Sequence, residues 1–505
     1  MPKTPLAELH ARLRTRRLVV ILLPLMLPAH APEFFTTLRT LLGPERCITD
    51  QGLLLPWECD GLSHLRQLPI AVLLPETRAE VVEIVRLAAE HGIPLTARGA
   101  GTCLSGGATA AQGGALIAFT RMKRILEIDP VNRTARVEPG LVNVRLSEAL
   151  KPLGLAYMPD PSSQTASTLG GNVAENSGGP HCIKHGNTTM SVLALEVVLA
   201  DGSVIELGHA RGRTEGPDLR GLFVGSEGTL GIVTSITFRL ERIPPAELTL
   251  LASFADMRSA CNGVSSVIAH GILPSAFEAI DDRTIAALEH AGKKSGYPSN
   301  AAAVLLLEFD GAAESVRAEA DAATALLRAA GALRIEEAED AAQRARLWKG
   351  RKGAYGAMGR LAPDLYVMDT VVPRSRLPEV LPAIGRICDE LGLPLANVFH
   401  AGEGNLHPNI SFDGRNPDQV RRVLEAGRRI VEVCLKAGGA LSGEHGIGTE
   451  KREFMPLAFG PETIELLHGL KAVFDPGRLL NPDKVLPEPV TCGEMRPAVL
   501  RGRSA

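Results

Sequence analysis

The sequence has no pair of cysteines spaced as Cys-x-x-Cys. Its cysteines are instead scattered over the whole chain, at Cys47, Cys59, Cys103, Cys182, Cys261, Cys388, Cys434 and Cys492. This spacing excludes a zinc ribbon or an iron–sulfur cluster held within the chain, and it gives no sign of a disulfide framework. We therefore expect a reducing, cytoplasmic setting.

An excess of basic residues is also missing, because the formal net charge is −3. A nucleic-acid-binding domain normally carries a basic excess, so the charge balance argues against such a partner. The apolar run at residues 18–27 is too short to span a bilayer. Four arginines precede it and Ala29-His30-Ala31 follows, which is typical of a signal peptide. Pro24 within the run and the missing disulfide pattern instead indicate a buried or partner-facing segment.

The length predicts more than one domain, since 505 residues are too many for one hydrophobic core. Apolar content of 45% with 22% charged residues is typical of a soluble globular protein. Pro244-Pro245 marks a plausible boundary. Short strands and glycine-rich loops precede it, while strands alternating with alanine-rich helices follow. We expect an α+β fold whose second part is an antiparallel sheet covered by helices.

The first glycine-rich loop, at residues 98–107, reads RGAGTCLSGG. A Rossmann fingerprint would need glycine at positions 99, 101 and 104, but position 104 is leucine. What remains is a series of backbone N–H groups with two hydroxyls, which can wrap a pyrophosphate. A plain glycine-rich turn is the alternative.

Two further loops have the same character. Residues 159–188 read PDPSSQTASTLGGNVAENSGGPHCIKHGNT, and residues 221–233 read GLFVGSEGTLGIV. Small side chains and free backbone N–H groups suit close contact with a polar, planar or anionic ligand. Three such loops in one α+β segment favour a single large, extended ligand.

Histidines and a glutamate gather in the second half of the chain. His400 and His407 lie seven residues apart, so on one straight strand they would face opposite ways. A hairpin at residues 402–405 would turn both into one cavity. The later segment SGEHGIG adds Glu444 and His445. Two histidines and a carboxylate are a usual ligand set for a catalytic divalent metal. Such a set also suits iron oxygenases, but zinc fits better if the ion acts only as a Lewis acid beside a redox cofactor.

Arg351 and Lys352 lie in the basic segment WKGRKGAY. One interpretation is a solvated basic turn. The other is an arginine clamp on a substrate carboxylate, a task that the planar guanidinium performs well.

Taken together, six segments resemble one family. They are PLTARGAGTCLSGGA, PDPSSQTASTLGGNVAENSGG, VGSEGTLGIVT, VFHAGEGNLHP, SGEHGIGTEK and FDPGRLLNPDK, in that order. In order and spacing they resemble the FAD-linked 2-hydroxy-acid oxidoreductases of the vanillyl-alcohol oxidase fold. That family includes the FAD subunit of bacterial glycolate oxidase and the D-lactate and D-2-hydroxyglutarate dehydrogenases.

The resemblance implies a division of the chain. Residues 1–55 would be a variable leader and residues 56–243 a PCMH-type FAD-binding domain. A substrate and metal cap would follow at 246–450. Residues 451–487 would form a helical segment that returns to the FAD domain, and 488–505 a tail.

The resemblance also implies which residues hold FAD. A histidine that tethers FAD in some relatives is absent from the first loop, so non-covalent FAD is expected. The implied contacts are Arg98, Gly99, Ala100, Gly101, Thr102, Ser105 and Gly106 at the pyrophosphate; Pro161, Ser162, Thr168, Gly171, Asn176 and Ser177 at the flavin; and Glu227, Gly228, Ile232 and Asn481 completing the pocket.

In the family's mechanism a divalent metal binds the carboxylate and hydroxyl oxygens of the substrate, and hydride passes from its α-carbon to flavin N5. By resemblance, the metal ligands are His400, His407 and Glu444, and the catalytic base is His445. Arg351 matches a carboxylate-binding arginine.

Two positions bear on the choice of substrate. Asn409 resembles a residue of the hydroxyglutarate enzymes and is expected to contact substrate. The lysine with which those enzymes hold a distal carboxylate is absent, because Val367 occupies the corresponding position. A short monoacid such as glycolate or D-lactate is therefore favoured, with D-2-hydroxyglutarate as the alternative.

The resemblance implies partners for the reduced flavin. Electrons would leave to an iron–sulfur subunit, a quinone or, slowly, oxygen, and a second FAD-type subunit would complete a glycolate oxidase-like complex. The leader could dock on a partner or on the inner face of the membrane. Two rival functions remain: a flavin-bearing assembly subunit without chemistry, and an alkyl-transfer enzyme of the ether-lipid type.

Overall fold

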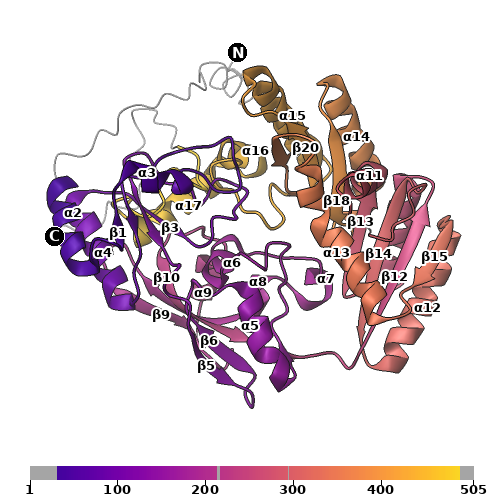
Figure 1. The fold of residues 1–505 in the computed structure, drawn as a ribbon, viewed down its shortest axis with the longest axis horizontal. Helices are drawn as coiled ribbons and strands as arrows, with labels where there is room; N and C mark the ends of the chain where they lie inside the picture. Colours follow the sequence, from indigo (N-terminus) through magenta and orange to yellow (C-terminus); the bar gives the residue numbers. More distant parts are fainter. Residues whose placement is uncertain (1–30, 213–215, 294, 489–505) are drawn as a thin grey trace.

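The computed structural model describes residues 31–488 except 213–215 and 294. The chain forms two lobes (Figure 1), a first one coloured indigo to magenta and a second one coloured pink to orange. The α+β fold expected from the sequence is confirmed. The apolar run at 18–27, Ala29-His30 of the cleavage-like segment and Cys492 lie outside the described residues.

The first lobe begins with a four-stranded sheet of order β1-β2-β4-β3. Its strands are β1 (Cys47–Ile48), β2 (Val72–Leu73), β4 (Ala115–Ala118) and β3 (Leu95–Arg98). Between β2 and β3 runs α4 (Arg78–His91), which begins with a capping box at Thr77 and Glu80 and ends at Gly92, where φ is +63°. This is the strand–helix–strand unit that the periodicity predicts.

Residues 31–55, which the sequence analysis assigns to the leader, contribute to this core. Helix α2 (Ala31–Leu42) places Phe34 and Leu38 against the apolar face of α4, and both side chains are fully buried. Strand β1 pairs with β2, and α3 (Gln51–Leu54) follows it.

The second sheet of this lobe is antiparallel, of order β5-β6-β10-β8-β9. Its strands are β5 (Ile125–Asp129), β6 (Thr134–Val137), β10 (Ile232–Arg239), β8 (Val192–Val198) and β9 (Val204–Gly208). The DG turn between β8 and β9 forms the expected hairpin. Short helices and a two-stranded ribbon accompany the sheet: α5 (Asn143–Leu150), α6 (Leu169–Glu175), α7 (Cys182–His185), α8 (Thr188–Ser191), α9 (Leu219–Phe223), β7 (Leu155–Ala156) and β11 (Glu241–Arg242).

The second lobe is built on an antiparallel sheet of order β15-β12-β14-β13-β18-β19-β17, to which β20 and β16 are added beside β18. Its strands are β12 (Ala246–Phe254), β13 (Ala276–Asp281), β14 (Ala303–Gly311), β15 (Arg334–Glu337), β16 (Asp364–Val367), β17 (Thr370–Val371), β18 (Leu395–His400), β19 (Asn405–Leu406) and β20 (Pro408–Phe412). Its helices are α10 (Met257–Ala269), α11 (Asp282–His290), α12 (Ala313–Ala329), α13 (Ala341–Met358), α14 (Leu377–Glu390) and α15 (Pro417–Lys436).

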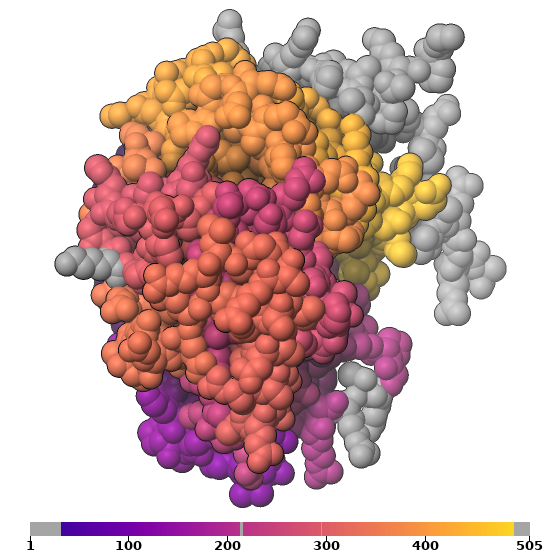
Figure 2. Space-filling view, turned by 90° about the vertical axis from the view of Figure 1, so that its right-hand side faces the viewer, coloured from indigo at the N-terminus to yellow at the C-terminus, as the bar shows by residue number. Residues whose placement is uncertain are grey.

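Alternate residues of this sheet serve two cores. Leu305 and Leu307 pack toward α10, α12, α14 and α15, whereas Val304 and Leu306 pack toward α11 and α13. Figure 2 shows the outward face of this lobe, most of which is formed by pink and orange residues of the lobe itself. Both faces of the sheet are therefore covered by helices of the same lobe, as the sequence predicts.

The chain then returns to the first lobe through α16 (Met455–Ala458) and α17 (Pro461–Phe474). Leu480 forms a parallel bridge with Leu95 at the start of β3. The backbone N–H of Leu95 donates to Leu479 O at 2.8 Å, and that of Asn481 donates to Leu95 O at 2.6 Å. Within the described ranges, no helix has both the length and the apolar character to cross a membrane.

Candidate active site

Two histidines reach one cavity because the chain turns back between them. His400 ends β18, and Asn405 at the start of β19 pairs with it. The turn at 401–404 is the predicted hairpin, so His407, which precedes β20, faces the same way as His400. The two rings lie 5.1 Å apart and nearly perpendicular, at 87°.

The loop that carries Glu444 and His445 is wrapped around a buried carboxylate. Asp369 Oδ2 accepts hydrogen bonds from Ser442 Oγ at 2.6 Å and from the N–H groups of Gly443, Glu444 and His445 at 2.8, 3.1 and 3.0 Å. Three consecutive N–H groups on one oxygen fix the backbone of the loop. Asp369 therefore sets where the side chains of Glu444 and His445 begin.

Lys451 completes the surroundings of Asp369. Both side chains are fully buried, and Lys451 Nζ lies 3.4 Å from Asp369 Oδ2 while donating to Asp369 O at 2.6 Å. Burial alone would raise the pKa of Asp369, but Lys451 and the nearby histidines hold that pKa well below its usual range. The carboxylate therefore stays charged and remains an acceptor for the loop.

The side chains converge on one oxygen of Glu444. Its Oε1 lies 3.1 Å from His400 Nε2, 3.2 Å from His407 Nε2 and 3.8 Å from His445 Nε2. The ring of His445 stacks on that of His407, with centroids 4.9 Å apart and an angle of 13°. The predicted ligands and the predicted base are thus neighbours.

This donor set fits a divalent metal. The ligand atoms of His400, His407 and Glu444 all lie within 4.8 Å of one another, as do those of Asp369, His407 and His445. Within the described chain, His407 Nδ1, His445 Nδ1 and Asp369 Oδ1 are buried without a hydrogen-bond partner. Two imidazoles and a carboxylate around one point, beside unpaired polar atoms, are the chemistry of a metal site with open positions.

The buried environment shifts the pKa values of His400, Glu444 and His445 in different directions. Burial would lower the pKa of His400, but Glu278 and Glu444 raise it well above its ordinary value. Burial also works against the charge of Glu444, yet His400 and His407 hold its pKa well below the usual range. For His445 burial is the dominant cause, and it lowers the pKa to about 4. The structure thus holds His445 neutral at pH 7.

Arg351 does not lie in a turn. It lies within α13, and its side chain is 5% exposed. Its Nε donates to Glu278 Oε2 at 2.5 Å, and Glu278 Oε1 accepts from His400 Nδ1 at 2.7 Å. Glu278 was not predicted as a site residue, although an acid in the middle of the apolar segment AFEAI is a detectable signal of a buried, paired carboxylate.

Asn409 and Val367 are direct partners in the β16–β20 pair. Asn409 is buried, and its Nδ2 donates to the backbone oxygen of His407 at 2.6 Å. The amide therefore holds the backbone at His407, just before β20 begins.

The loop at 98–107 follows β3 and offers unpaired backbone. Within the described residues, the N–H groups of Ala100, Gly101, Thr102, Gly106 and Gly107 donate to no protein acceptor. A series of free N–H groups can bind an anion, so the loop fits the pyrophosphate that the resemblance implies here.

Arg98 supports this loop from behind. Its guanidinium donates to Cys59 O at 2.8 Å and to Ala108 O at 3.0 Å, and it lies over the ring of Trp57. Gly101 has φ of +71°, which favours glycine, and a Cβ there would lie 2.3 Å from this guanidinium. Arg98 therefore holds this loop in place by donating hydrogen bonds to two backbone carbonyls.

The loop at 159–188 packs against the first one. A Cβ at Gly99 would lie 2.2 Å from Thr168 Oγ1, which caps α6 by accepting from Gly171 N at 3.3 Å. Asn176 ends α6 in the left-handed conformation, and its Oδ1 accepts from Thr189.

Other predicted contacts of this loop lie along its edges. Pro161 O accepts from Gln164 N at 2.8 Å in a turn that leaves Ser162 exposed, and Ser177 O accepts from Thr188. A Cβ at Gly178 would lie 2.7 Å from Glu444 Oε2. The predicted flavin loop and the metal-type cluster are therefore in contact.

Glu227 and Asn481 tie the loops together. The Glu227 carboxylate accepts from the N–H groups of Ile447 and Gly448 at 2.6 and 2.8 Å, and burial raises its pKa to about 7. Asn481 Nδ2 donates to Gly107 O and Glu227 O at 3.0 and 2.7 Å.

The remaining predicted residues lie beside these ties. Ser105 is fully buried, and its backbone oxygen accepts from Thr449 N and Glu450 N. Gly228 has φ of +67°, and Ile232 is buried in the core of the first lobe.

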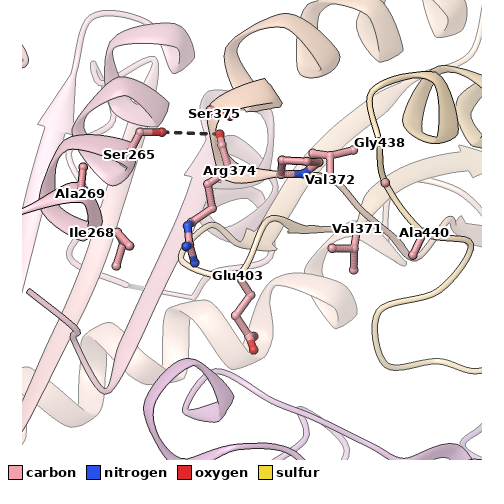
Figure 3. Close-up of a pocket in the computed structure, with 12 residues that line it drawn as sticks. Ser265, Ile268, Ala269, Val371, Val372, Arg374, Ser375, Glu403, Gly438 and Ala440 are labelled. Carbon is pink, nitrogen blue, oxygen red and sulfur yellow. Dashed lines mark hydrogen bonds between the residues drawn. The ribbon is translucent and has the colours of Figure 1, made fainter. Parts of the chain in front are cut away.

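A separate hollow of about 770 Å³ opens in the second lobe (Figure 3). Arg374 and Glu403 line it, together with β17 and residues 438–440, and Arg374 Nη1 donates to Gly402 O at 2.9 Å. It contains none of the predicted site residues. Glu403 belongs to the turn between His400 and His407, so the hollow lies next to the hairpin that carries them.

Comparison with known families matches both lobes. A family described as FAD binding domain covers residues 69–208, and one described as FAD linked oxidases, C-terminal domain, covers residues 243–485.

Curated relatives match almost the whole chain. Glycolate oxidase subunit GlcD of Escherichia coli K12 is 45% identical over 90% of this chain and 90% of its own length. The Bacillus subtilis GlcD subunit is 38% identical over 88% and 94%, respectively. A D-lactate dehydrogenase of Anaerostipes hadrus is 32% identical over 80% and 87%.

Solved structures show the same fold at low identity. A p-cresol methylhydroxylase superposes with a TM-score of 0.77 at 19% identity, covering 90% of this chain and 96% of that one. An alkyldihydroxyacetonephosphate synthase superposes with a TM-score of 0.72 at 19% identity, covering 90% and 86%. The family matches and the relatives together carry the assignment: this chain belongs to the FAD-linked 2-hydroxy-acid oxidoreductases.

Proposed function

We propose that this protein oxidises a short 2-hydroxy acid, glycolate or D-lactate, to the 2-oxo acid. The observation that carries the proposal is the convergence of His400, His407 and His445 on Glu444 Oε1, at 3.1 to 3.8 Å, against the loop at 159–188. The relatives are named glycolate oxidase subunit and D-lactate dehydrogenase, which supports the same substrate class.

FAD would lie non-covalently against the unpaired N–H groups of the loop at 98–107 and against the loop at 159–188. A divalent ion, zinc in our proposal, would be held by His400, His407 and Glu444. When bound, the ion supplies Lewis acidity that lowers the pKa of the substrate hydroxyl, and FAD supplies the acceptor for the two electrons that leave the α-carbon as hydride.

His445 is the proton acceptor in this scheme. Burial lowers its pKa to about 4, so the imidazole is neutral at pH 7 and can take the hydroxyl proton. Its ring is fixed by stacking on His407, and its backbone by Asp369. Loss of this proton and of hydride from the α-carbon leaves the 2-oxo acid.

Arg351 would bind the substrate carboxylate. Its Nε is engaged by Glu278, and no hydrogen bond joins either terminal nitrogen to a described residue. Asn409 would add a contact, and Val367 opposite it offers no charge for a second carboxylate. For D-2-hydroxyglutarate, the alternative substrate, this part of the site would offer no cation to the second carboxylate.

Electrons would then pass to a partner. The sequence holds no cluster-type cysteine spacing, so we propose an iron–sulfur subunit, with a second FAD-type subunit, or a quinone as acceptor. With such an acceptor, the protein would work in the cytoplasm, and its leader would hold it at the inner face of the membrane.

The test is an anaerobic visible spectrum of the purified chain with glycolate, D-lactate, L-lactate and D-2-hydroxyglutarate added in turn. Bleaching of the flavin by glycolate or one D-acid, prevented by a chelator, is the expected result. A yellow protein that none of the acids bleaches would overturn the proposal in favour of the assembly subunit or the alkyl-transfer enzyme.

A further inference from the structure

We propose that Glu278 is a positioning residue that holds a metal ligand and the substrate-binding arginine with one carboxylate. This rests on the proposed function, because it takes His400 as a ligand and Arg351 as the carboxylate clamp. The consequence is that metal binding and substrate binding depend on the same side chain.

The fold places Glu278 directly opposite His400. The two residues are partners in the antiparallel pair of β13 and β18, so their side chains lie on one face of the sheet. Residues of that parity in β13, Ala276 and Ile280, pack toward α11 and α13. Arg351 lies on α13 and reaches the same carboxylate from that layer.

Each oxygen of Glu278 has its own task. Oε1 accepts from His400 Nδ1 at 2.7 Å, and Oε2 accepts from Arg351 Nε at 2.5 Å. The Glu278 side chain is fully buried, so water does not compete for either bond. The short distances are those of charge-assisted hydrogen bonds.

The bond to His400 selects a tautomer. An ionised carboxylate only accepts, so Nδ1 must carry the proton. The lone pair of a neutral ring then lies on Nε2, the atom that points to Glu444 Oε1 at 3.1 Å. A carboxylate behind a histidine ligand raises its basicity and fixes its plane.

The bond to Arg351 aims the guanidinium. With Nε tied to Glu278, the planar fork has a fixed direction, and within the described residues its terminal nitrogens have no protein partner. They therefore remain available for a bidentate bond to a carboxylate.

A matched buried glutamate lies on the neighbouring strand. Glu308 of β14 accepts from His181 at 3.1 Å, from Arg344 and from Trp348, and its side chain is 2% exposed. Its partners join the loop at 159–188 to the second lobe and include none of the predicted ligands. Glu308 is therefore a control. Its substitution also removes a buried carboxylate that binds a histidine and an arginine, but it leaves the carboxylate behind His400 in place.

The experiment compares Glu278→Gln with Glu308→Gln in the full chain. Glutamine offers one acceptor and one donor group, so at position 278 it cannot accept from both His400 Nδ1 and Arg351 Nε. We expect zinc affinity, measured by titration against a competing chelator, to fall about 10- to 100-fold in Glu278→Gln. The KM for the acid should rise at saturating zinc, and the FAD absorbance should stay. Glu308→Gln should keep the wild-type zinc affinity.

Wild-type zinc affinity and wild-type KM in Glu278→Gln would overturn the proposal. If Glu278→Gln does not accumulate as folded protein, Glu278→Asp serves, since it keeps both acceptors on a side chain one methylene shorter; a smaller loss of zinc affinity is expected, and none would overturn the proposal. Zinc affinity is read without turnover. If the wild type oxidises no 2-hydroxy acid while Glu278→Gln still loses zinc affinity, the proposed function fails and the role of Glu278 behind His400 stands.

Discussion

The two halves of the candidate site use different parts of the chain, one the backbone and the other side chains. The cradle in the first lobe consists of backbone: unpaired N–H groups at Ala100 to Thr102, and glycines such as Gly99 that admit no Cβ. The cluster in the second lobe consists of side chains that meet at Glu444 Oε1. The first half should therefore be sensitive to added volume, and the second to lost chemistry.

Removal of the metal should show the difference between the two halves most clearly. Dialysis against a strong chelator takes an ion from the side-chain half and leaves the backbone half intact. We expect flavin reduction by the acid to be abolished and the FAD spectrum to be unchanged, with activity restored by zinc. Parallel loss of FAD would show that the two halves do not bind their groups independently.

His445→Ala should remove the proton acceptor alone. The turnover number should fall about 10²- to 10⁴-fold, the usual contribution of a general base. FAD absorbance and zinc content should equal those of the wild type, because His445 is not among the proposed ligands. A variant with wild-type turnover would remove His445 from the mechanism.

Gly99→Ala should damage only the backbone half. The added Cβ would lie 2.2 Å from Thr168 Oγ1, so the two loops must separate. We expect FAD affinity to fall at least about 10-fold, corresponding to about 1.4 kcal/mol, while zinc affinity is retained. Gly385→Ala is the control, because nothing lies within 4 Å of its Cβ position. Equal FAD affinity in the two variants would contradict the predicted cradle.

The smallest effect concerns the contact between the halves. Burial would lower the pKa of His181, but Asp160 and Glu308 outweigh it and raise the pKa to about 10. An unfolded histidine titrates near pH 6.5, so this stabilisation is complete below about pH 6.5 and is lost as pH rises toward 10. The melting temperature should fall between pH 7 and 10.

His181→Gln should flatten that pH dependence. At pH 7 the variant should be less stable by about 3 kcal/mol, the lower part of the range for breaking a buried ion pair. Exposed His270 provides the control, since His270→Gln should keep the wild-type profile. A wild-type slope in His181→Gln would place the pH dependence elsewhere.

The sequence alone predicted what is local. The strand–helix–strand unit around α4, the β8–β9 hairpin and the turn between His400 and His407 follow from periodicity and turn residues. It did not predict the strand β13, because Glu278 interrupts an otherwise apolar segment. Nor did it predict that Asp369 organises the loop at 442–445, since that contact joins residues more than 70 positions apart.

The same distinction holds for the basic segment around Arg351. Its charges suggested a turn, but the helix α13 buries Arg351 against a carboxylate that only the folded sheet supplies. A buried charge is stable only with its partner, and a partner 73 positions away leaves no mark on local composition.

The return of the chain to β3 has a consequence for the order of events during synthesis. Asn481 Nδ2 donates to the carbonyls of Gly107 and Glu227, and Leu480 lies beside Leu95, so the lobe that is made first is completed by a segment made hundreds of residues later. A nascent chain that ends before Asn481 lacks this closure. The flavin should therefore be taken up only after this segment has been made, and a chain truncated before Asn481 should accumulate without colour.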